Sequence, residues 1–547
     1  MKNAKKLITL CLALCVSFTT LLGGFGCNKT NNDSGPYANE TLEIFVVNAG
    51  YGRDWLYDTI DEFKKQDWVN EKYPNLKVLE PSWNTSSNFI DSKITSGLKG
   101  NTIDLMFSCA SVASQYEKKD SSTGNYYFED LDESVFDATI PGENVTVKSK
   151  MNPQVYAQTN IILKDKSQVR FAMPWINGMM GFMYNQDKID TVFGENYVMP
   201  RTTNEFVECV KTLKNDLPQF PGAQYEIDAP FIFAGMTRYF NANFQVWWAQ
   251  YEGLSQYENF WNGVNEDGVF SNEIFAQTGR LRSLEVCESL VEKDLGYNHE
   301  LCTTGQYQEV QANFLAGRTG VFMPVGDWLI TEAYGMNITA EIRMMKTPVI
   351  SSIVEKLSSI KTDEQLAYVV QCVDEQKDYE TAKAGYKFGV ELKKADYDYV
   401  KSARNMMYRM TGHEAFVPSY ALGKEVAKDF LIFMASDIGI KAFGKSTYGH
   451  QTPYNYTPSE EEFNSYCPLQ QDHHEYLKTA ILLPPESIFK LNYMGGVNPM
   501  TKCPAILSAF AQTSKASRKS ASKVYQDDIN LYTEGYFNMK LDLAGLI

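Results

Sequence analysis

The stretch TLEIFVVNAGYGRDWLYDTIDEFKKQ, residues 41–66, decides the fold class. It opens with a run rich in β-branched residues and passes through a glycine-containing turn. It then places Leu56, Ile60 and Phe63 on one face of a helix. A strand, a turn and an amphipathic helix form the first unit of a parallel α/β sheet. The sequence therefore predicts an α/β protein.

The same alternation recurs directly downstream. Residues 75–80 predict a second strand, residues 89–100 an amphipathic helix and residues 103–109 a third strand. Three strands joined by crossovers make half of an open doubly wound sheet, whose ligands lie at the carboxyl ends of the strands. Here those ends fall near residues 48–51, Trp83 and residues 108–110.

Helix signals continue in the second half of the chain. Thr202 and Glu205 have the spacing of a capping box at the start of a predicted helix. Residues 306–317 predict another helix, which a short strand follows. The turn after that strand carries Asp327 and Trp328, an acidic and an aromatic side chain at a predicted strand end.

The first residues of the chain have the features of an export signal. Three lysines precede an apolar run at residues 7–22, which is shorter than the roughly 20 residues of a membrane-spanning helix. Cys27 follows a small residue and opens a polar tract, as in bacterial lipoprotein signals, although Gly24 stands where such signals carry leucine. We expect residues 1–26 to be removed, Cys27 to be acylated and residues 27–40 to form a flexible tether. Simple secretion and a transmembrane anchor are the alternatives.

Length and charge narrow the class of protein further. About 520 residues remain after the leader, more than one hydrophobic core supports, so two or more lobes are expected. The formal net charge of -16 becomes -19 without the three leader lysines, which argues against nucleic-acid binding.

Cysteine and histidine residues predict neither a disulfide framework nor a metal centre. The seven cysteines beyond Cys27 are odd in number and show no C-x-x-C spacing. They are expected to be buried and reduced. Three of the five histidines stand alone in the sequence, and the pair His473 and His474 is expected in a solvated turn.

Five segments, in this order, carry a resemblance to a known family. The chain resembles the extracellular solute-binding proteins of carbohydrate ABC importers, which include maltose-binding protein. The segments are EIFVVNAGYGRDWLYDTIDEFKKQ (43–66), MPWINGMMGFMYNQDKI (173–189), RTTNEFVECVKTLK (201–214), FLAGRTGVFMPVGDW (314–328) and KEVAKDFLIFMASDIGIKAF (424–443). Two departures are Arg201, where the family's helix carries proline, and a long insertion at about residues 350–408.

The resemblance implies a two-lobed periplasmic-binding-protein-like fold of the class II type, each lobe a sheet flanked by helices, with a hinge between them. The first lobe would hold residues 41–170 and 409–455, and the second residues 171–408 and 456–547. A ligand would be trapped in the cleft by hinge closure. Such a protein is a monomer that needs no cofactor and no metal. It works on the extracellular face of the cytoplasmic membrane and delivers an oligosaccharide to ABC permease subunits.

Sugar sites combine flat aromatic rings, which cover C–H faces, with planar polar groups that pair with hydroxyls. Asn177 is a candidate because it stands beside Gly178, where the family's cleft-lining acid lies. Trp247 and Trp248 are adjacent on a predicted helix, so one of them is expected in the core. The candidate binding residues are Tyr51, Trp83, Trp175, Asn177, Tyr239, Trp247, Trp248, Asp327 and Trp328.

Two other functions compete with transport. A surface glycan-binding protein would keep the cleft without docking to a permease. A secreted glycoside hydrolase would need an acid and a base or nucleophile flanking the bond. No carboxylate pair stands out at the predicted strand ends, and the chain contains neither G-x-S-x-G nor H-E-x-x-H. We therefore expect a binding protein and not an enzyme.

Overall fold

The computed structural model describes residues 35–547 with gaps at 49, 85–101, 110–111, 113–114, 164, 166, 218–227, 236–238, 334–335, 337, 411, 485–508 and 512–513. The leader, Cys27, the first part of the tether and the helix expected at residues 89–100 lie outside the described residues.

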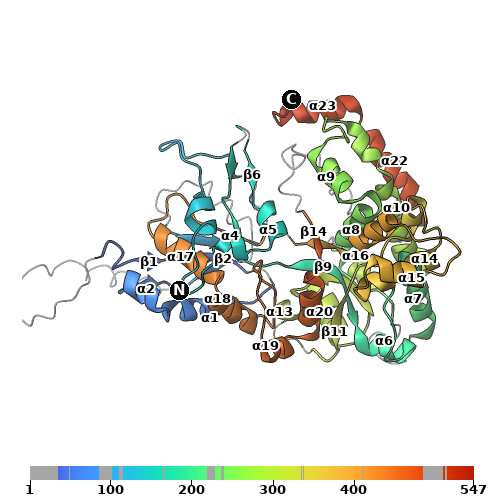
Figure 1. The fold of residues 1–547 in the computed structure, drawn as a ribbon, viewed down its shortest axis with the longest axis horizontal. Coiled ribbons are helices and arrows are strands. Elements are labelled where there is room, and N and C mark those ends of the chain that lie inside the picture. Colours follow the sequence, from blue (N-terminus) through green and yellow to red (C-terminus); the bar gives the residue numbers. More distant parts are fainter. Residues whose placement is uncertain are drawn as a thin grey trace, which may run out of the picture.

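Two five-stranded sheets form the centres of two lobes (Figure 1). The sheet of the first lobe has the order β4-β2-β5-β13-β8. In it β2 runs parallel to β4 and β5, and β13 runs antiparallel to β5 and β8. Its strands are β2 (Ile44–Val47), β4 (Ser82–Asn84), β5 (Leu105–Phe107), β8 (Met173–Pro174) and β13 (Glu414–Phe416).

Smaller elements complete the first lobe. Helix α1 buries Leu56, Ile60 and Phe63, so the predicted apolar face is confirmed. Of the strand expected at residues 75–80, only Lys77 and Val78 are paired, with Thr41 and Leu42. Pro81, which has no N–H to donate to a ladder, separates this short strand from β4. The elements are β1 (Thr41–Leu42), α1 (Asp54–Lys64), α2 (Asp67–Lys72), β3 (Lys77–Val78), α4 (Val147–Lys150), α5 (Pro153–Gln158), β6 (Ile161–Ile162), β7 (Gln168–Val169), α17 (Lys424–Met434) and α18 (Asp437–Ser446).

The sheet of the second lobe is built around β9 (Met179–Asn185), whose seven residues are all buried. Its order is β10-β9-β12-β14, and β11 also pairs with β9. A strand buried on both faces reads as an unbroken apolar run, as this one does. The other strands are β10 (Phe322–Gly326), β11 (Ile342–Met345), β12 (Met406–Arg409) and β14 (Ile481–Leu483).

Helices surround this second sheet (Figure 1). At the start of α7, Thr202 Oγ1 accepts from the Glu205 N–H at 3.2 Å, so this half of the predicted capping box is confirmed. The Glu205 carboxylate accepts instead from the Arg201 N–H, at 2.7 Å. The helices are α6 (Gln186–Phe193), α7 (Thr203–Asp216), α8 (Phe240–Glu252), α9 (Leu254–Asn262), α10 (Thr278–Val291), α11 (Leu301–Thr304), α12 (Tyr307–Leu315), α13 (Leu329–Glu332), α22 (Ala521–Leu531) and α23 (Glu534–Leu543).

The insertion at residues 350–408 enlarges the second lobe. It folds into α14 (Asp363–Asp374), α15 (Tyr379–Gly385) and α16 (Lys394–Asn405), and α16 packs against α8. Two further helices, α19 (Glu460–Ser465) and α20 (Pro468–Leu477), follow the last connection between the lobes, and α20 packs against β11.

Within the described ranges, the chain crosses between the two sheets in three neighbouring segments. The Trp175 N–H donates to the His413 carbonyl at 3.2 Å, and the Met410 N–H donates to the Gly178 carbonyl at 2.8 Å. The Asn177 N–H donates to the Gln451 carbonyl at 2.8 Å. The three crossings therefore form one hydrogen-bonded hinge. Among the described residues no helix combines the length and the apolar character of a membrane span.

Candidate ligand-binding cleft

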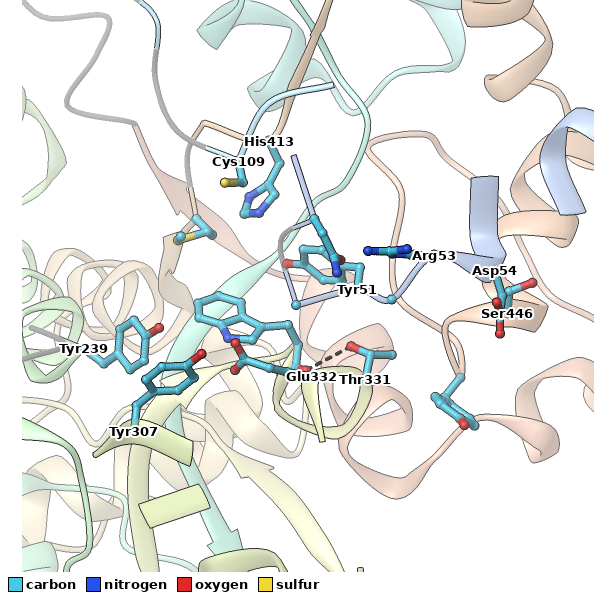
Figure 2. A pocket seen from close by; sticks show the side chains of 16 residues that line it. Tyr51, Arg53, Asp54, Cys109, Tyr239, Tyr307, Thr331, Glu332, His413 and Ser446 are labelled. Carbon is cyan, nitrogen blue, oxygen red and sulfur yellow. Dashed lines mark hydrogen bonds between the residues drawn. The ribbon is translucent and has the colours of Figure 1, made fainter. Parts of the chain in front are cut away.

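A cavity of about 700 Å³ lies between the lobes (Figure 2). Much of its first-lobe wall comes from the loop after β2 and the start of α1, where strand ends of an open sheet are expected to hold ligands. The second-lobe wall comes from the starts of α8 and α12 and from the turn that leads into α13. The lining residues are Asn48, Gly50, Tyr51, Gly52, Arg53, Asp54, Cys109, Tyr239, Tyr307, Trp328, Thr331, Glu332, Met410, His413, Ser446 and Tyr448.

Trp328 is the residue at which the two lobes meet inside this cavity. A side-chain carbon at Gly50 in the first lobe would stand 2.9 Å from the indole Cδ1, and one at Gly326 would fall within the ring. Both positions therefore need glycine for the indole to lie where it does. The ring also packs edge-on against Tyr239, with centroids 5.6 Å apart, and against Tyr51 at 6.4 Å.

Tyr51 separates the cavity from a buried polar cluster. Its hydroxyl donates to Asp327 Oδ1 at 3.4 Å, and its ring packs edge-on against His450 at 4.8 Å and His413 at 5.1 Å. Burial, together with the neighbouring Asp327 carboxylate, raises the pKa of Tyr51 well above its usual value. The hydroxyl therefore stays protonated and remains a donor.

Asp327 holds the hinge and does not face the cavity. Its side chain is fully buried, and its Oδ2 lies 3.2 Å from both His450 Nδ1 and His473 Nδ1. Burial would raise the pKa of Asp327, but the two imidazoles outweigh it and hold that pKa below the usual range. Asp327 thus links Tyr51 and His450 to His473 on α20.

The expectation that His473 lies in a solvated turn is wrong. Helix α20 packs against β11 and turns His473 inward, where the side chain is fully buried. Sequence reasoning missed this cluster because Asp327, His450 and His473 lie far apart in the chain.

Trp175 and Asn177 lie away from the cavity, which corrects the expectation for both. The Trp175 ring stacks on Trp55 with centroids 4.7 Å apart. The Asn177 side-chain oxygen accepts from Arg409 Nε at 3.2 Å. Gly178 leaves no room for the family's acid, because a side-chain carbon there would stand 2.8 Å from the Tyr51 hydroxyl.

Trp247 and Trp248 are both core residues, so the expectation that one of them faces the cleft is also corrected. Helix α8 is buried on every side, and therefore has no separate core and cleft faces. Trp247 Nε1 donates to the Pro348 carbonyl at 3.1 Å, and Trp248 Nε1 donates to Gln277 Oε1 at 2.8 Å.

Trp83 stands behind the rim of the cavity. Its Nε1 donates to the Tyr57 hydroxyl at 3.2 Å, and the Arg53 guanidinium carbon lies 5.2 Å from its ring centroid.

Of the nine predicted residues, Tyr51, Tyr239 and Trp328 line the cavity. Their contact with a ligand stays a prediction.

Sequence reasoning did not find Tyr307, Glu332 or His413. Glu332 lies four residues after Trp328, one helical turn away, and this spacing was the available signal. Its Oε2 accepts from Gln311 Nε2 at 2.7 Å, the Trp328 side chain is a second donor, and burial raises its pKa.

Comparisons with known proteins place the fold. No protein-family model and no curated protein sequence matches the chain. Solved sugar-binding proteins match it over nearly their whole length. RafE in complex with raffinose has a TM-score of 0.54 at 15% identity, over 92% of this chain and 100% of its own. The bacterial solute receptor AcbH, described as preferring β-D-galactopyranose, has a TM-score of 0.56 at 10% identity, over 91% and 99%.

A third structure is Lmo0181 from Listeria monocytogenes in complex with cycloalternan. Its TM-score is 0.54 at 14% identity, over 91% of this chain and 99% of its own. The chain therefore has the two-lobed α/β fold of solute-binding proteins, and the predicted fold class is confirmed.

Proposed function

We propose that this protein is a lipid-anchored extracellular receptor that captures an oligosaccharide and delivers it to an ABC permease. The observation that carries the proposal is the cavity between the lobes, in which aromatic rings and polar groups from both lobes face the same space. Its volume of about 700 Å³ lies within the usual range of ligand pockets.

The chemistry of the walls supports a sugar ligand. Tyr239 and Tyr307 offer ring surface to apolar C–H groups, and Glu332 offers an acceptor to hydroxyl groups. Structures of the same fold were solved with raffinose and with cycloalternan. No chemistry is required of the protein in this role.

Hinge closure would couple binding to delivery. The cavity draws residues from both lobes, so a ligand that contacts Tyr51 and Tyr307 together binds the closed arrangement better than an open one. The permease would then receive the closed complex. In this proposal acylated Cys27 keeps the receptor on the extracellular face of the cytoplasmic membrane.

The test begins with thermal unfolding of the full chain, purified in detergent, against a panel of mono- and oligosaccharides. A ligand at 100 times its dissociation constant should add about 2.7 kcal/mol to the free energy of unfolding. Tyr307→Ala should weaken binding, because Tyr307 lines the cavity and is 41% exposed, so the fold tolerates its loss. Tyr536→Ala, on the distant helix α23, is the matched control and should leave binding unchanged.

Further measurements separate the rival functions. The saccharide recovered after incubation should be intact, whereas cleavage would favour a hydrolase. Uptake of the identified sugar by cells should need this protein, and binding without any uptake defect would favour a surface glycan-binding protein. Cys27→Ala should release the protein from the membrane fraction.

A further inference from the structure

Glu332 is a carboxylate without a cation. It lines the cavity from α13, and its two hydrogen-bond donors, Gln311 and the Trp328 indole, are both neutral. Within the described part of the chain, no lysine, arginine or histidine stabilises it. The imidazoles of His450 and His473 contact the Asp327 carboxylate instead. A largely buried charge of this kind is unfavourable unless a partner arrives.

Aromatic rings surround this carboxylate. Tyr239, Tyr307 and Trp328 line the same wall, and Figure 2 shows the hydroxyl ends of Tyr239 and Tyr307 directed toward Glu332. The Tyr239 and Trp328 ring centroids are 5.6 Å apart. Aromatic faces attract cations, and a carboxylate among them attracts the same cation through its negative charge.

The facing wall adds neutral polar side chains. Asn48 and His413 both line the cavity, and Asn48 Oδ1 and His413 Nδ1 are enclosed by protein with no hydrogen-bond partner among the described residues. Burial lowers the pKa of His413 to about 4, so its imidazole is neutral near pH 7 and can accept through one nitrogen. The cation in the lining is Arg53, which is exposed at the rim over Trp83.

Hydroxyl groups of a neutral sugar could donate to Glu332 but would leave its charge uncompensated. An ammonium group supplies three donors and the missing positive charge together. We propose, on the basis of the proposed receptor function, that the ligand is an oligosaccharide with a free amine, an amino sugar. Its ammonium binds Glu332 between the Tyr239 and Tyr307 rings.

The test compares two chains that differ in charge. A glucosamine tetrasaccharide and its fully N-acetylated, uncharged counterpart are titrated calorimetrically into the full chain in detergent, at a pH where the free amine is protonated. The wild-type protein should prefer the amine by at least about tenfold, the scale of one charge-assisted contact. Glu332→Gln keeps an acceptor oxygen but removes the charge, so it should abolish that preference by weakening binding of the amine far more than binding of the acetylated chain.

Three variants complete the design. Glu195→Gln removes an exposed carboxylate of the second lobe that does not line the cavity, and should change neither affinity. Tyr239→Phe keeps the ring and should keep the preference for the amine, whereas Tyr239→Leu should lower it. Glu332→Gln should melt no lower than wild type, because it removes a buried charge that no cation compensates.

Equal or tighter binding of the acetylated chain by the wild type would overturn the inference. So would an equal loss of both ligands in Glu332→Gln, which would make Glu332 an ordinary acceptor of hydroxyl groups. If only other neutral saccharides bind, the amine inference fails and the receptor function stands. If no saccharide binds, both fail.

Discussion

A methyl group added at Gly178 tests how the hinge is packed behind the cavity. The Cβ of Gly178→Ala would stand 2.8 Å from the Tyr51 hydroxyl and 3.2 Å from Asp327 Oδ1. The backbone of Gly178 does not have the positive φ that would strain alanine. The expected cost of about 1–3 kcal/mol is therefore that of overpacking.

The atom that clashes is the Tyr51 hydroxyl oxygen, so its removal should relieve the clash. Tyr51→Phe alone removes a 3.4 Å hydrogen bond to a buried carboxylate, for which we expect a loss of about 1.5 kcal/mol. In the double variant the methyl group occupies the space that the hydroxyl oxygen vacates. The double variant should therefore be little less stable than Tyr51→Phe, although additive effects would give about 2.5–4.5 kcal/mol.

The assay is urea denaturation at neutral pH, followed by tryptophan fluorescence and circular dichroism. Gly535→Ala is the matched control, because a methyl group there meets no atom within 4 Å, and helix propensity predicts no loss of stability. Additive effects of Gly178→Ala and Tyr51→Phe would refute the packing described for the hinge. A Gly178→Ala variant as stable as wild type would do the same.

Three further predictions concern other parts of the chain. Thr202→Ala removes the cap of α7 and should lower stability by about 1 kcal/mol in chemical denaturation. Burial lowers the pKa of His413 from 6.5 to about 4, so the unfolded chain takes up this proton first. About 3 kcal/mol of stability should therefore be lost as pH falls through that window, and His413→Asn should flatten this slope. Burial raises the pKa of Cys109 to about 11, and because Cys109 lines the cavity, a bound ligand should slow its alkylation at pH 8.

Local sequence patterns predicted the fold well, because the spacing of apolar residues along a helix or strand depends on local backbone geometry. The apolar spacing of Leu56, Ile60 and Phe63 follows the helical period, and the structure buries all three. Trp328 was singled out because it stands in the turn after a short strand, where side chains reach a cleft, and it lines the cavity. Residue type alone could not place Trp247, since a tryptophan on a wholly buried helix and one beside a cleft look alike in sequence.

The polar cluster of Asp327, His450 and His473 could not be predicted from the sequence, for a different reason. Asp327 meets His450 and His473 only because three crossings bring distant segments together at the hinge. Asp327 and Trp328 were both predicted to bind the ligand because they stand at a predicted strand end, but Trp328 lines the cavity and the Asp327 side chain is buried behind it. A residue's place at a strand end predicts where its backbone lies, but long-range packing decides which way its side chain turns.

The side chains of Asp327 and Trp328 point in different directions from one turn, and this arrangement affects how a ligand is captured. Trp328 touches Gly50 across the cavity, while Asp327 joins Tyr51 to His473 behind it. Opening of the hinge would separate Trp328 from Gly50 and expose the indole to water. Burial of the indole therefore favours the closed arrangement, and a ligand that contacts residues of both lobes at once adds to that preference. The turn at residues 327–328 therefore contributes both to the wall of the cavity and to the polar cluster between the lobes. This shared position couples ligand binding in the cavity to closure of the hinge.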